Sequence, residues 1–313
     1  MVETVVSMGL PVDEHLVIRK NRLMPEELGK ELKRIGIVTG THGDELEGQF
    51  VCYELNRRIQ EHPEYLQGIV DIYPAFNPLG IDSITRGIPM FDLDMNRIFP
   101  GSEDGPMMET IVRQLMDDLA GADMCVDIHA SNIYLEEMPQ VRINEETAER
   151  LVPYAKMINV DFVWVHASAT VLESTLAYSL NMIGVPTLVV EMGVGMRITE
   201  SYGCQLVEGI LNLMKEMGIW AGPVGEVRTP IVSSDREIGF VNADHPGIYL
   251  PKARIFDDVD EGDIIGRIVD PMTGNIMEEV KAPIAGKVFT RREYPIVYSG
   301  SLLNRILGGV QEQ

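Results

Sequence analysis

The chain has 313 residues, with 26 Lys or Arg against 48 Asp or Glu, and a formal net charge of −22 at pH 7. An acidic surface of this kind repels nucleic-acid phosphates, so we expect no nucleic-acid partner. No run approaches the ~18 apolar residues of a membrane helix, and the first residues lack a basic segment followed by an apolar one. We therefore expect a cytoplasmic protein with no membrane partner. The three widely spaced cysteines support this location, because an odd number at such spacing suits reduced thiols.

Short apolar runs alternate with amphipathic stretches through the first 222 residues. The apolar runs, expected to form strands, are 34–39, 68–74, 124–129 and 187–191, and the amphipathic stretches, expected to form helices, are 45–59, 109–119, 145–158 and 205–217. Alternating strands and helices are typical of an α/β fold with parallel strands. We predict a mixed, largely parallel sheet flanked by helices.

The composition changes near residue 222, where residues 218–225 are rich in Gly and Pro. Residues 1–222 carry a net charge of −18 and residues 223–313 only −4. Beyond the change, short β-branched runs at 247–250, 263–269, 286–290 and 295–298 are separated by Gly, Pro and Asp, as in small all-β modules. The sequence thus predicts an α/β domain over 1–222 and a small all-β domain over 223–313.

Two histidines and a glutamate follow predicted strands. His42 and Glu45 lie in the turn after the strand 35–39, and His129 ends the run 124–129. Open α/β sheets place their sites at the carboxyl ends of strands, so these side chains can converge. Two His and one Glu with an open fourth position form the ligand set of hydrolytic zinc sites. Taken alone, the spacing of His42 and Glu45 is more typical of a capped helix start.

Further polar residues accompany these three. Glu191 ends the strand 187–191 and is the natural general base, although a structural Glu paired with an Arg is the alternative. Asn96 and Arg97 lie side by side between apolar residues, and an amide next to a guanidinium suits a substrate carboxylate; a solvated loop is the alternative. Arg142 is either a further substrate-binding residue or an arginine at a strand edge.

Five short motifs together resemble the succinylglutamate desuccinylase/aspartoacylase family, which has a zinc-carboxypeptidase-like fold. In chain order they are GTHGDE at 40–45, NPLG at 77–80, DMNRIFPG at 94–101, DIHA at 127–130 and VEMG at 190–193. They occur in the order of the family and extend over most of residues 35–222. The first and third are specific on their own.

The resemblance implies a role for each matching residue. His42, Glu45 and His129 would bind one Zn²⁺ per chain, Glu191 would activate a water at that metal, Asn96 and Arg97 would hold the substrate carboxylate, Arg86 would polarise the scissile carbonyl, and Asp94 would orient His42. It also implies that residues 1–222 form a zinc-dependent catalytic domain.

The end of the chain has a resemblance of its own. Residues 247–306 resemble the β-barrel or biotinyl/lipoyl-like hairpin module that closes many bacterial family members. Carrier domains need a lysine at an exposed hairpin tip, and the corresponding turn, 270–275, has none. We therefore expect no swinging arm, and instead a lid or a contact in a homo-oligomer.

These observations predict a zinc-dependent hydrolase that cleaves the amide of a small N-acyl amino acid. The desuccinylase, aspartoacylase and N-acetyl-diamino-acid deacetylase types all remain open, although the charge of −18 on residues 1–222 slightly disfavours dianionic substrates. A zinc carboxypeptidase or cell-wall peptide amidase would use the same residues on a longer substrate. A non-catalytic metal-binding protein is the second alternative.

Overall fold

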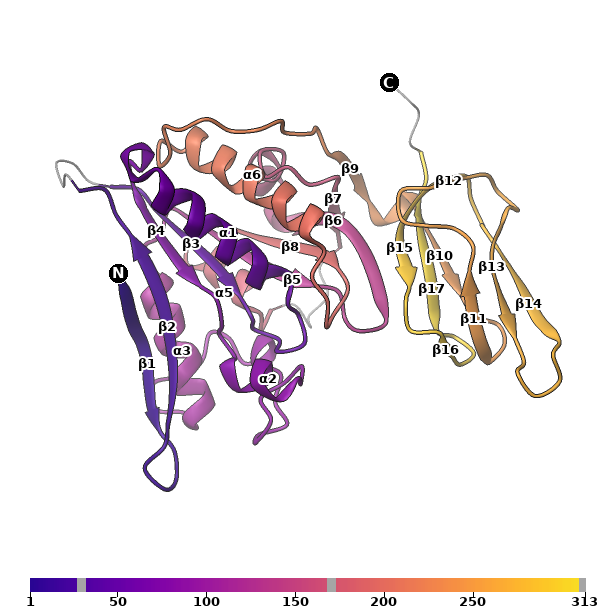
Figure 1. Cartoon of the computed structure of the whole chain (residues 1–313), viewed down its shortest axis with the longest axis horizontal. Coiled ribbons are helices and arrows are strands. Elements are labelled where there is room, and N and C mark those ends of the chain that lie inside the picture. Colours follow the sequence, from indigo (N-terminus) through magenta and orange to yellow (C-terminus); the bar gives the residue numbers. More distant parts are fainter. Residues whose placement is uncertain (27–31, 168–172, 310–313) are drawn as a thin grey trace.

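The computed structural model describes residues 1–26, 32–167 and 173–309 (Figure 1). Its α-helices are α1 (Glu47–Glu61), α2 (Pro78–Ser83), α3 (Met107–Leu119), α4 (Ala148–Ala155), α5 (Leu176–Met182) and α6 (Glu200–Glu216). Short 3₁₀ helices occupy Pro63–Tyr65, Met95–Arg97, Glu145–Thr147 and Asp235–Glu237. None of these helices combines the length and the apolar character needed to cross a membrane.

The strands of the N-terminal part are β1 (Val2–Gly9), β2 (His15–Leu23), β3 (Arg34–Thr39), β4 (Ile69–Tyr73), β5 (Met124–Ala130), β6 (Leu135–Asn144), β7 (Phe162–His166) and β8 (Thr187–Gly193). Those of the C-terminal part are β9 (Ile231–Ser234), β10 (Ile238–Asn242), β11 (Gly247–Pro251), β12 (Asp258–Val259), β13 (Ile264–Val269), β14 (Ile276–Lys281), β15 (Gly286–Arg292), β16 (Ile296–Val297) and β17 (Leu302–Leu307).

The large sheet is mixed, with a parallel centre. β4, β3, β5 and β8 are neighbours in this order and run parallel, and β6 pairs antiparallel with β8. Parallel strands end at the same edge, so the carboxyl ends of β3, β5 and β8 lie together. The predicted fold class is confirmed: a mixed, mostly parallel sheet with helices, followed by a module with an antiparallel sheet (Figure 1).

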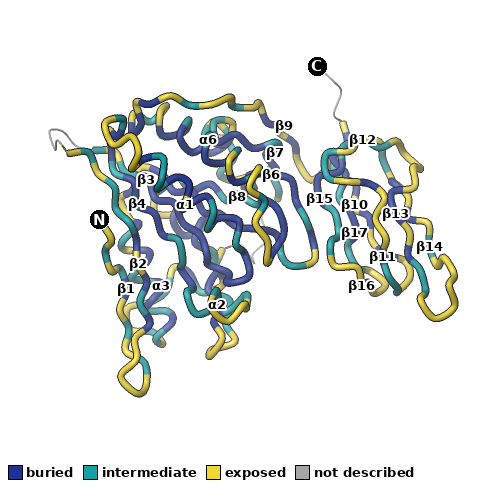
Figure 2. Tube along the Cα trace, in the orientation of Figure 1, coloured by how far each residue is buried: buried dark blue, intermediate teal, exposed yellow. Residues whose placement is uncertain are grey.

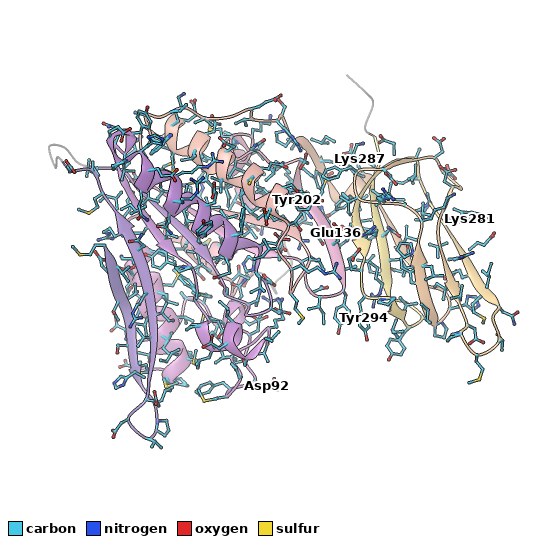
Figure 3. All side chains as sticks on the ribbon, in the orientation of Figure 1. Asp92, Glu136, Tyr202, Lys281, Lys287 and Tyr294 are labelled. Atoms are coloured by element: carbon cyan, nitrogen blue, oxygen red, sulfur yellow. The ribbon has the colours of Figure 1, made fainter. Side chains whose placement is uncertain are left out.

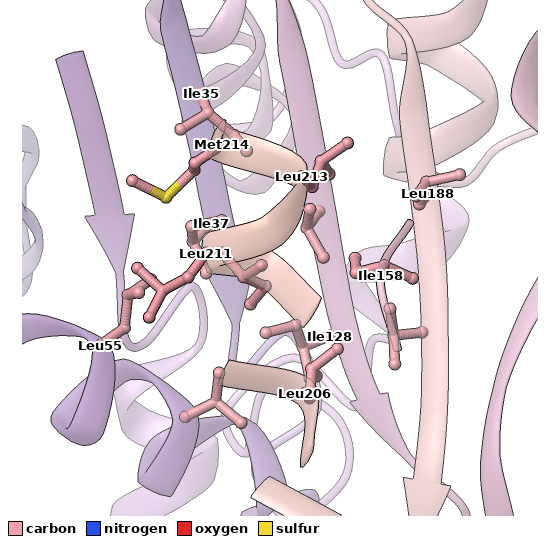
Figure 4. Packing of buried hydrophobic residues seen from close by; sticks show 14 of the residues in the cluster. Ile35, Ile37, Leu55, Ile128, Ile158, Leu188, Leu206, Leu211, Leu213 and Met214 are labelled. Atoms are coloured by element: carbon pink, nitrogen blue, oxygen red, sulfur yellow. The ribbon is translucent and has the colours of Figure 1, made fainter. Parts of the chain in front are cut away.

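Helices pack on both faces of this sheet. Neighbouring strand residues point to opposite faces, and Ile37 belongs to a core cluster with α1, α4 and α6, whereas Val38 belongs to one with α3 and α5. Leu55 of α1 and Leu206 of α6 are among the side chains of the first cluster (Figure 4). Full burial of each such Leu or Ile contributes about 1.5–3 kcal/mol. The central strands are consequently buried along most of their length (Figure 2), which gives the site at their ends a rigid base.

The sheet does not stop at the predicted boundary near residue 222. β9 pairs with β7, and β15 pairs with β6, so that β17 and β10 extend the large sheet. A separate antiparallel sheet, in the order β14, β13, β11 and β16, completes the C-terminal module. Lys281 and Lys287 lie in strands of this module (Figure 3), and the turn 270–275 between β13 and β14 has no lysine.

Candidate functional site

A compact turn after β3 carries two of the predicted metal ligands. Gly40 has a positive φ of 68°, and a Cβ on Gly43 would lie only 2.0 Å from the carbonyl carbon of Gly80 at α2. Glycine tolerates both the left-handed backbone and the close approach, so the chain can fold back sharply here. The turn buries His42 and Glu45, which are 3% and 4% exposed.

The three predicted ligands converge at the carboxyl ends of β3 and β5. Glu45 Oε1 lies 2.7 Å from His42 Nδ1, and Glu45 Oε2 lies 2.8 Å from His129 Nδ1. One ligand atom from each residue lies within 4.8 Å of the others, and all three residues are buried. The contact between His42 Nδ1 and Glu45 lacks the geometry of a hydrogen bond, so this buried nitrogen makes none among the described residues. A buried imidazole nitrogen without a hydrogen bond, next to a carboxylate and a second imidazole, suits a bound Zn²⁺.

A carboxylate lies behind each of these imidazoles. His42 Nε2 is hydrogen-bonded to Asp94 Oδ1 at 3.0 Å, the contact expected of a residue that orients His42. His129 Nε2 lies 3.2 Å from Asp127 Oδ2, and Asp127 is 1% exposed. Such carboxylate–imidazole contacts fix the ring orientation of a metal ligand. Asp127 was not among the residues predicted for the site, although its position two residues before His129 on one strand puts both side chains on the same face.

The pKa values of the clustered side chains are shifted by burial and by their mutual charges. Burial acts to raise the pKa of Glu45, but the charge and hydrogen bond of His129, together with His42, outweigh it and hold that pKa well below its usual range. Burial acts to lower the pKa of His129, but the charges of Asp127 and Glu45 prevail and raise it well above its usual range. Glu45 is therefore ionised, and the imidazoles must lose a proton before they can bind a metal.

The predicted substrate residues lie around this cluster. Arg86 Nη1 is 2.8 Å from Glu45 Oε1, and Arg86 Nη2 is 3.5 Å from Asp94 Oδ2. Asn96 is 8% exposed and accepts a hydrogen bond from Leu176 N at the start of α5, whereas Arg97 is exposed. Asn96 is thus held in place by the fold, while the guanidinium of Arg97 is accessible from solvent.

Glu191 lies beside the cluster because of the strand register. It is paired with His129 between β8 and β5, and its Oε1 is 3.4 Å from Arg142 Nη1. Burial raises the pKa of Glu191, and the charges of Arg142 and His129 offset this only in part. A carboxylate with a raised pKa is better matched to accepting and returning a proton near neutral pH.

A single pocket of about 550 Å³ joins all these groups. Its lining includes every residue predicted for the site except Asp94, namely His42, Glu45, Arg86, Asn96, Arg97, His129, Arg142 and Glu191. His166, at the end of β7, is also part of the lining. Glu137 and Arg305 also line it and were not foreseen, because Arg305 lies more than 110 residues after Glu191 and no motif surrounds it.

Comparison with known proteins gives a consistent result. The sequence profile of the succinylglutamate desuccinylase/aspartoacylase catalytic domain matches residues 31–217. The N-alpha-acetyl-L-2,4-diaminobutyric acid deacetylase of Halomonas elongata is 27% identical over 263 residues, which cover 81% of this chain and 75% of that protein.

Solved structures share the fold over nearly the whole chain. The product-bound ectoine utilization protein EutE (DoeB) of Ruegeria pomeroyi superposes with a TM-score of 0.82 at 22% identity, covering 97% of this chain and 94% of that one. A succinylglutamate desuccinylase from a Silicibacter species has a TM-score of 0.83 at 21% identity, covering 98% and 95%. The similarity includes the C-terminal module as well as the α/β part.

Proposed function

Because the chain belongs to the succinylglutamate desuccinylase/aspartoacylase family, as its motifs predicted, and is therefore a hydrolase, we propose that it is a zinc-dependent deacylase of small N-acyl amino acids. The reaction would cleave the amide bond and release a carboxylate and a free amine. The observation that carries the proposal is the convergence of His42, Glu45 and His129 in the pocket of about 550 Å³.

His42, Glu45 and His129 would hold one Zn²⁺ ion, with Asp94 and Asp127 fixing the two imidazoles from behind. A zinc ion with three protein ligands acts as a Lewis acid and makes water acidic enough to attack at neutral pH.

The other residues would handle the proton and the substrate. Glu191 would accept a proton from the attacking water and then donate it to the leaving nitrogen, a role that its raised pKa supports. Arg86 would polarise the carbonyl oxygen, because its guanidinium lies next to Glu45. Asn96, Arg97 and Arg142 would bind the substrate carboxylate, and Asn96 is held in place because its side-chain oxygen accepts a hydrogen bond from Leu176 N.

An acylated diamino acid is the substrate type that we favour. The relative from Halomonas elongata is named for an acetylated diaminobutyric acid. A free ammonium group would also suit the surface of a chain with a net charge of −22 better than a second carboxylate would. The volume of about 550 Å³ lies within the range of pockets that hold small molecules, as a small amide requires.

The test combines metal analysis with a substrate panel. The purified protein should contain about one zinc per chain, and the His42→Ala and His129→Ala variants should each lose most of it. N-acetyl-L-2,4-diaminobutyrate, N-acetyl-L-aspartate, N-succinyl-L-glutamate and a dipeptide are then assayed for released amine. Hydrolysis of the dipeptide alone would favour a peptidase, and full zinc retention in both histidine variants would contradict the assigned ligands.

A further inference from the structure

Residues on three neighbouring strands share one register where the C-terminal module joins the large sheet. Glu137 of β6 pairs with Thr290 of β15, and Thr290 pairs with Arg305 of β17. Directly paired residues project from the same face of a sheet. Arg305 therefore reaches back across the small side chain of Thr290, and its Nη1 lies 2.9 Å from Glu137 Oε1. The C-terminal module thereby delivers a guanidinium to the pocket.

Glu137 connects this guanidinium to Arg142. Its other oxygen, Oε2, accepts hydrogen bonds from Arg142 Nη2 and from Gln140 Nε2. Glu137 is only 1% exposed, and a carboxylate so deeply buried requires charged partners on both oxygens. Arg305 and Arg142 are thus held by opposite oxygens of one buried group.

Trp164 of β7 supports the same two arginines. The guanidinium carbons of Arg142 and Arg305 lie 5.5 and 5.3 Å from the centre of the Trp164 ring, within the range of cation–π attraction. The indole is itself anchored, because its Nε1 donates a hydrogen bond to Asp235 Oδ1 at 2.6 Å. Contact with this anchored ring therefore restricts the movement of both guanidinium groups.

Arg142 is only partly covered by these partners. Its side chain is 27% exposed and lines the pocket, and its Nη1 lies 3.4 Å from Glu191 Oε1, a distance long enough to leave that nitrogen available to a ligand. Both Arg142 and Glu191 line the pocket, so a ligand that carries a carboxylate can complete the unused donors of Arg142.

We propose that Arg305 is a positioning residue of the active site: through Glu137 it fixes the guanidinium of Arg142 where that group binds the carboxylate of the substrate. The identity of the substrate rests on the proposed deacylase function, whereas the position of Arg142 does not. The C-terminal module then contributes to substrate affinity by way of one ion pair, without touching the substrate.

The first experiment compares Arg305→Met with the wild-type protein on two amides. For N-acetyl-L-2,4-diaminobutyrate we expect KM to rise about tenfold and kcat to change less than about threefold, since a charge-assisted hydrogen bond contributes roughly that much to binding. N-acetyl-1,3-diaminopropane is the same amide without the carboxylate, and its KM should be the same in both proteins. An equal rise in KM for both amides would indicate a general disturbance of the active site and would overturn the proposal.

Arg291→Met is the matched control. Arg291 of β15 also ties the module to β6, because its Nη2 lies 2.8 Å from Oε2 of Glu136, which is labelled in Figure 3. Neither residue lines the pocket. This variant should keep the wild-type KM for both amides. A rise in KM equal to that of Arg305→Met would mean that any weakening of the junction has the same effect, which contradicts the proposal.

Two more variants test the route through Glu137. Glu137→Gln should raise KM as Arg305→Met does, and the double variant should be no worse than either single one, because both remove the same connection. If the increases in KM of the two single variants added fully in the double variant, the proposed connection through Glu137 would be refuted. Arg305→Lys retains the charge and should fold even where Arg305→Met does not, with an intermediate KM.

A crystal structure of the Arg305 variants keeps the two proposals distinguishable. If the wild-type protein hydrolyses neither amide, the deacylase proposal fails on these substrates, and the position of Arg142 decides the inference. We expect its guanidinium to be displaced or disordered in Arg305→Met. An unchanged, well-ordered Arg142 would overturn the inference whatever the enzyme acts on.

Discussion

Replacement of Glu191 by Gln distinguishes a catalytic role of this carboxylate from a structural one. Glutamine has nearly the same shape and still forms hydrogen bonds, but it cannot accept a proton. General acid–base catalysis contributes about 10²–10⁴ in rate, which corresponds to roughly 3–5 kcal/mol of transition-state stabilisation. On the proposed mechanism, kcat of Glu191→Gln should therefore fall by about 10²–10⁴ while zinc content is retained.

The structure also sets the expected loss of stability. Breaking a buried ion pair costs about 3–5 kcal/mol when it leaves one charge uncompensated. Arg142 faces Glu191 at 3.4 Å but is also bound by Glu137, so the Gln variant leaves it a carboxylate partner. We expect unfolding to become easier by only about 1 kcal/mol, equivalent to a Tm decrease of about 2–4 °C.

A matched variant checks this reasoning. Glu136→Gln removes a carboxylate from Arg291, which keeps Glu293 as its partner, in the same way as Arg142 keeps Glu137. Zinc content, Tm and kcat are measured for both variants on single preparations. The control should keep wild-type turnover, and near-wild-type turnover in a folded, zinc-loaded Glu191→Gln protein would refute the assigned base.

The remaining predictions concern the metal site and a buried ion pair between β4 and β2. Asp94→Asn should weaken zinc binding about 10- to 100-fold in a metal titration, because the ring of His42 loses its anionic partner. The raised pKa of His129 in the metal-free protein means that metal and protons compete, so calorimetry in buffers of different ionisation enthalpy should detect proton release and an affinity that falls as the pH is lowered. Asp71→Asn should lower the free energy of unfolding by about 3–5 kcal/mol in urea, because Asp71 is 1% exposed and pairs with Arg22 at 2.7 Å; a loss below about 1 kcal/mol would contradict this.

The sequence predicted the centre of the fold because the central strands are buried on both faces. Such strands are continuous apolar runs, and those predicted at 34–39 and 124–129 correspond to β3 and to all but the last residue of β5. β1, β2 and β6 were missed, because they mix charged and apolar residues. β6 reads Leu-Glu-Glu-Met-Pro-Gln-Val-Arg-Ile-Asn, and only its pairing with β8 and β15 explains why it is extended.

The sequence revealed most of the site residues because each lies in a turn or at a strand end, with a recognisable motif around it. Arg305 lies in no such motif. Its place in the pocket depends on the register of β17 with β15 and of β15 with β6, which is long-range pairing that composition and spacing do not encode. The predicted boundary near residue 222 was likewise drawn from composition, which does not reveal that strands from both sides of it pair in one sheet.

The charge balance of the pocket bears on which acyl amino acid it can accept. Arg86 is paired with Glu45, and Arg142 and Arg305 share Glu137. Of the described residues, none forms an ion pair with Arg97, whose Nη1 donates a hydrogen bond only to the carbonyl of the neighbouring Asn96. With the first carboxylate of a substrate bound at Arg97 and Arg142, a second carboxylate would have to compete with Glu45 for Arg86 or with Glu137 for Arg305. An ammonium group in its place would not. We therefore expect kcat/KM for N-acetyl-L-2,4-diaminobutyrate to exceed that for N-acetyl-L-aspartate by at least about tenfold, the order of one unfavourable charge contact. Equal kcat/KM values for the two amides would contradict this prediction, because they would show that a substrate carboxylate readily displaces the internal carboxylates from their arginines.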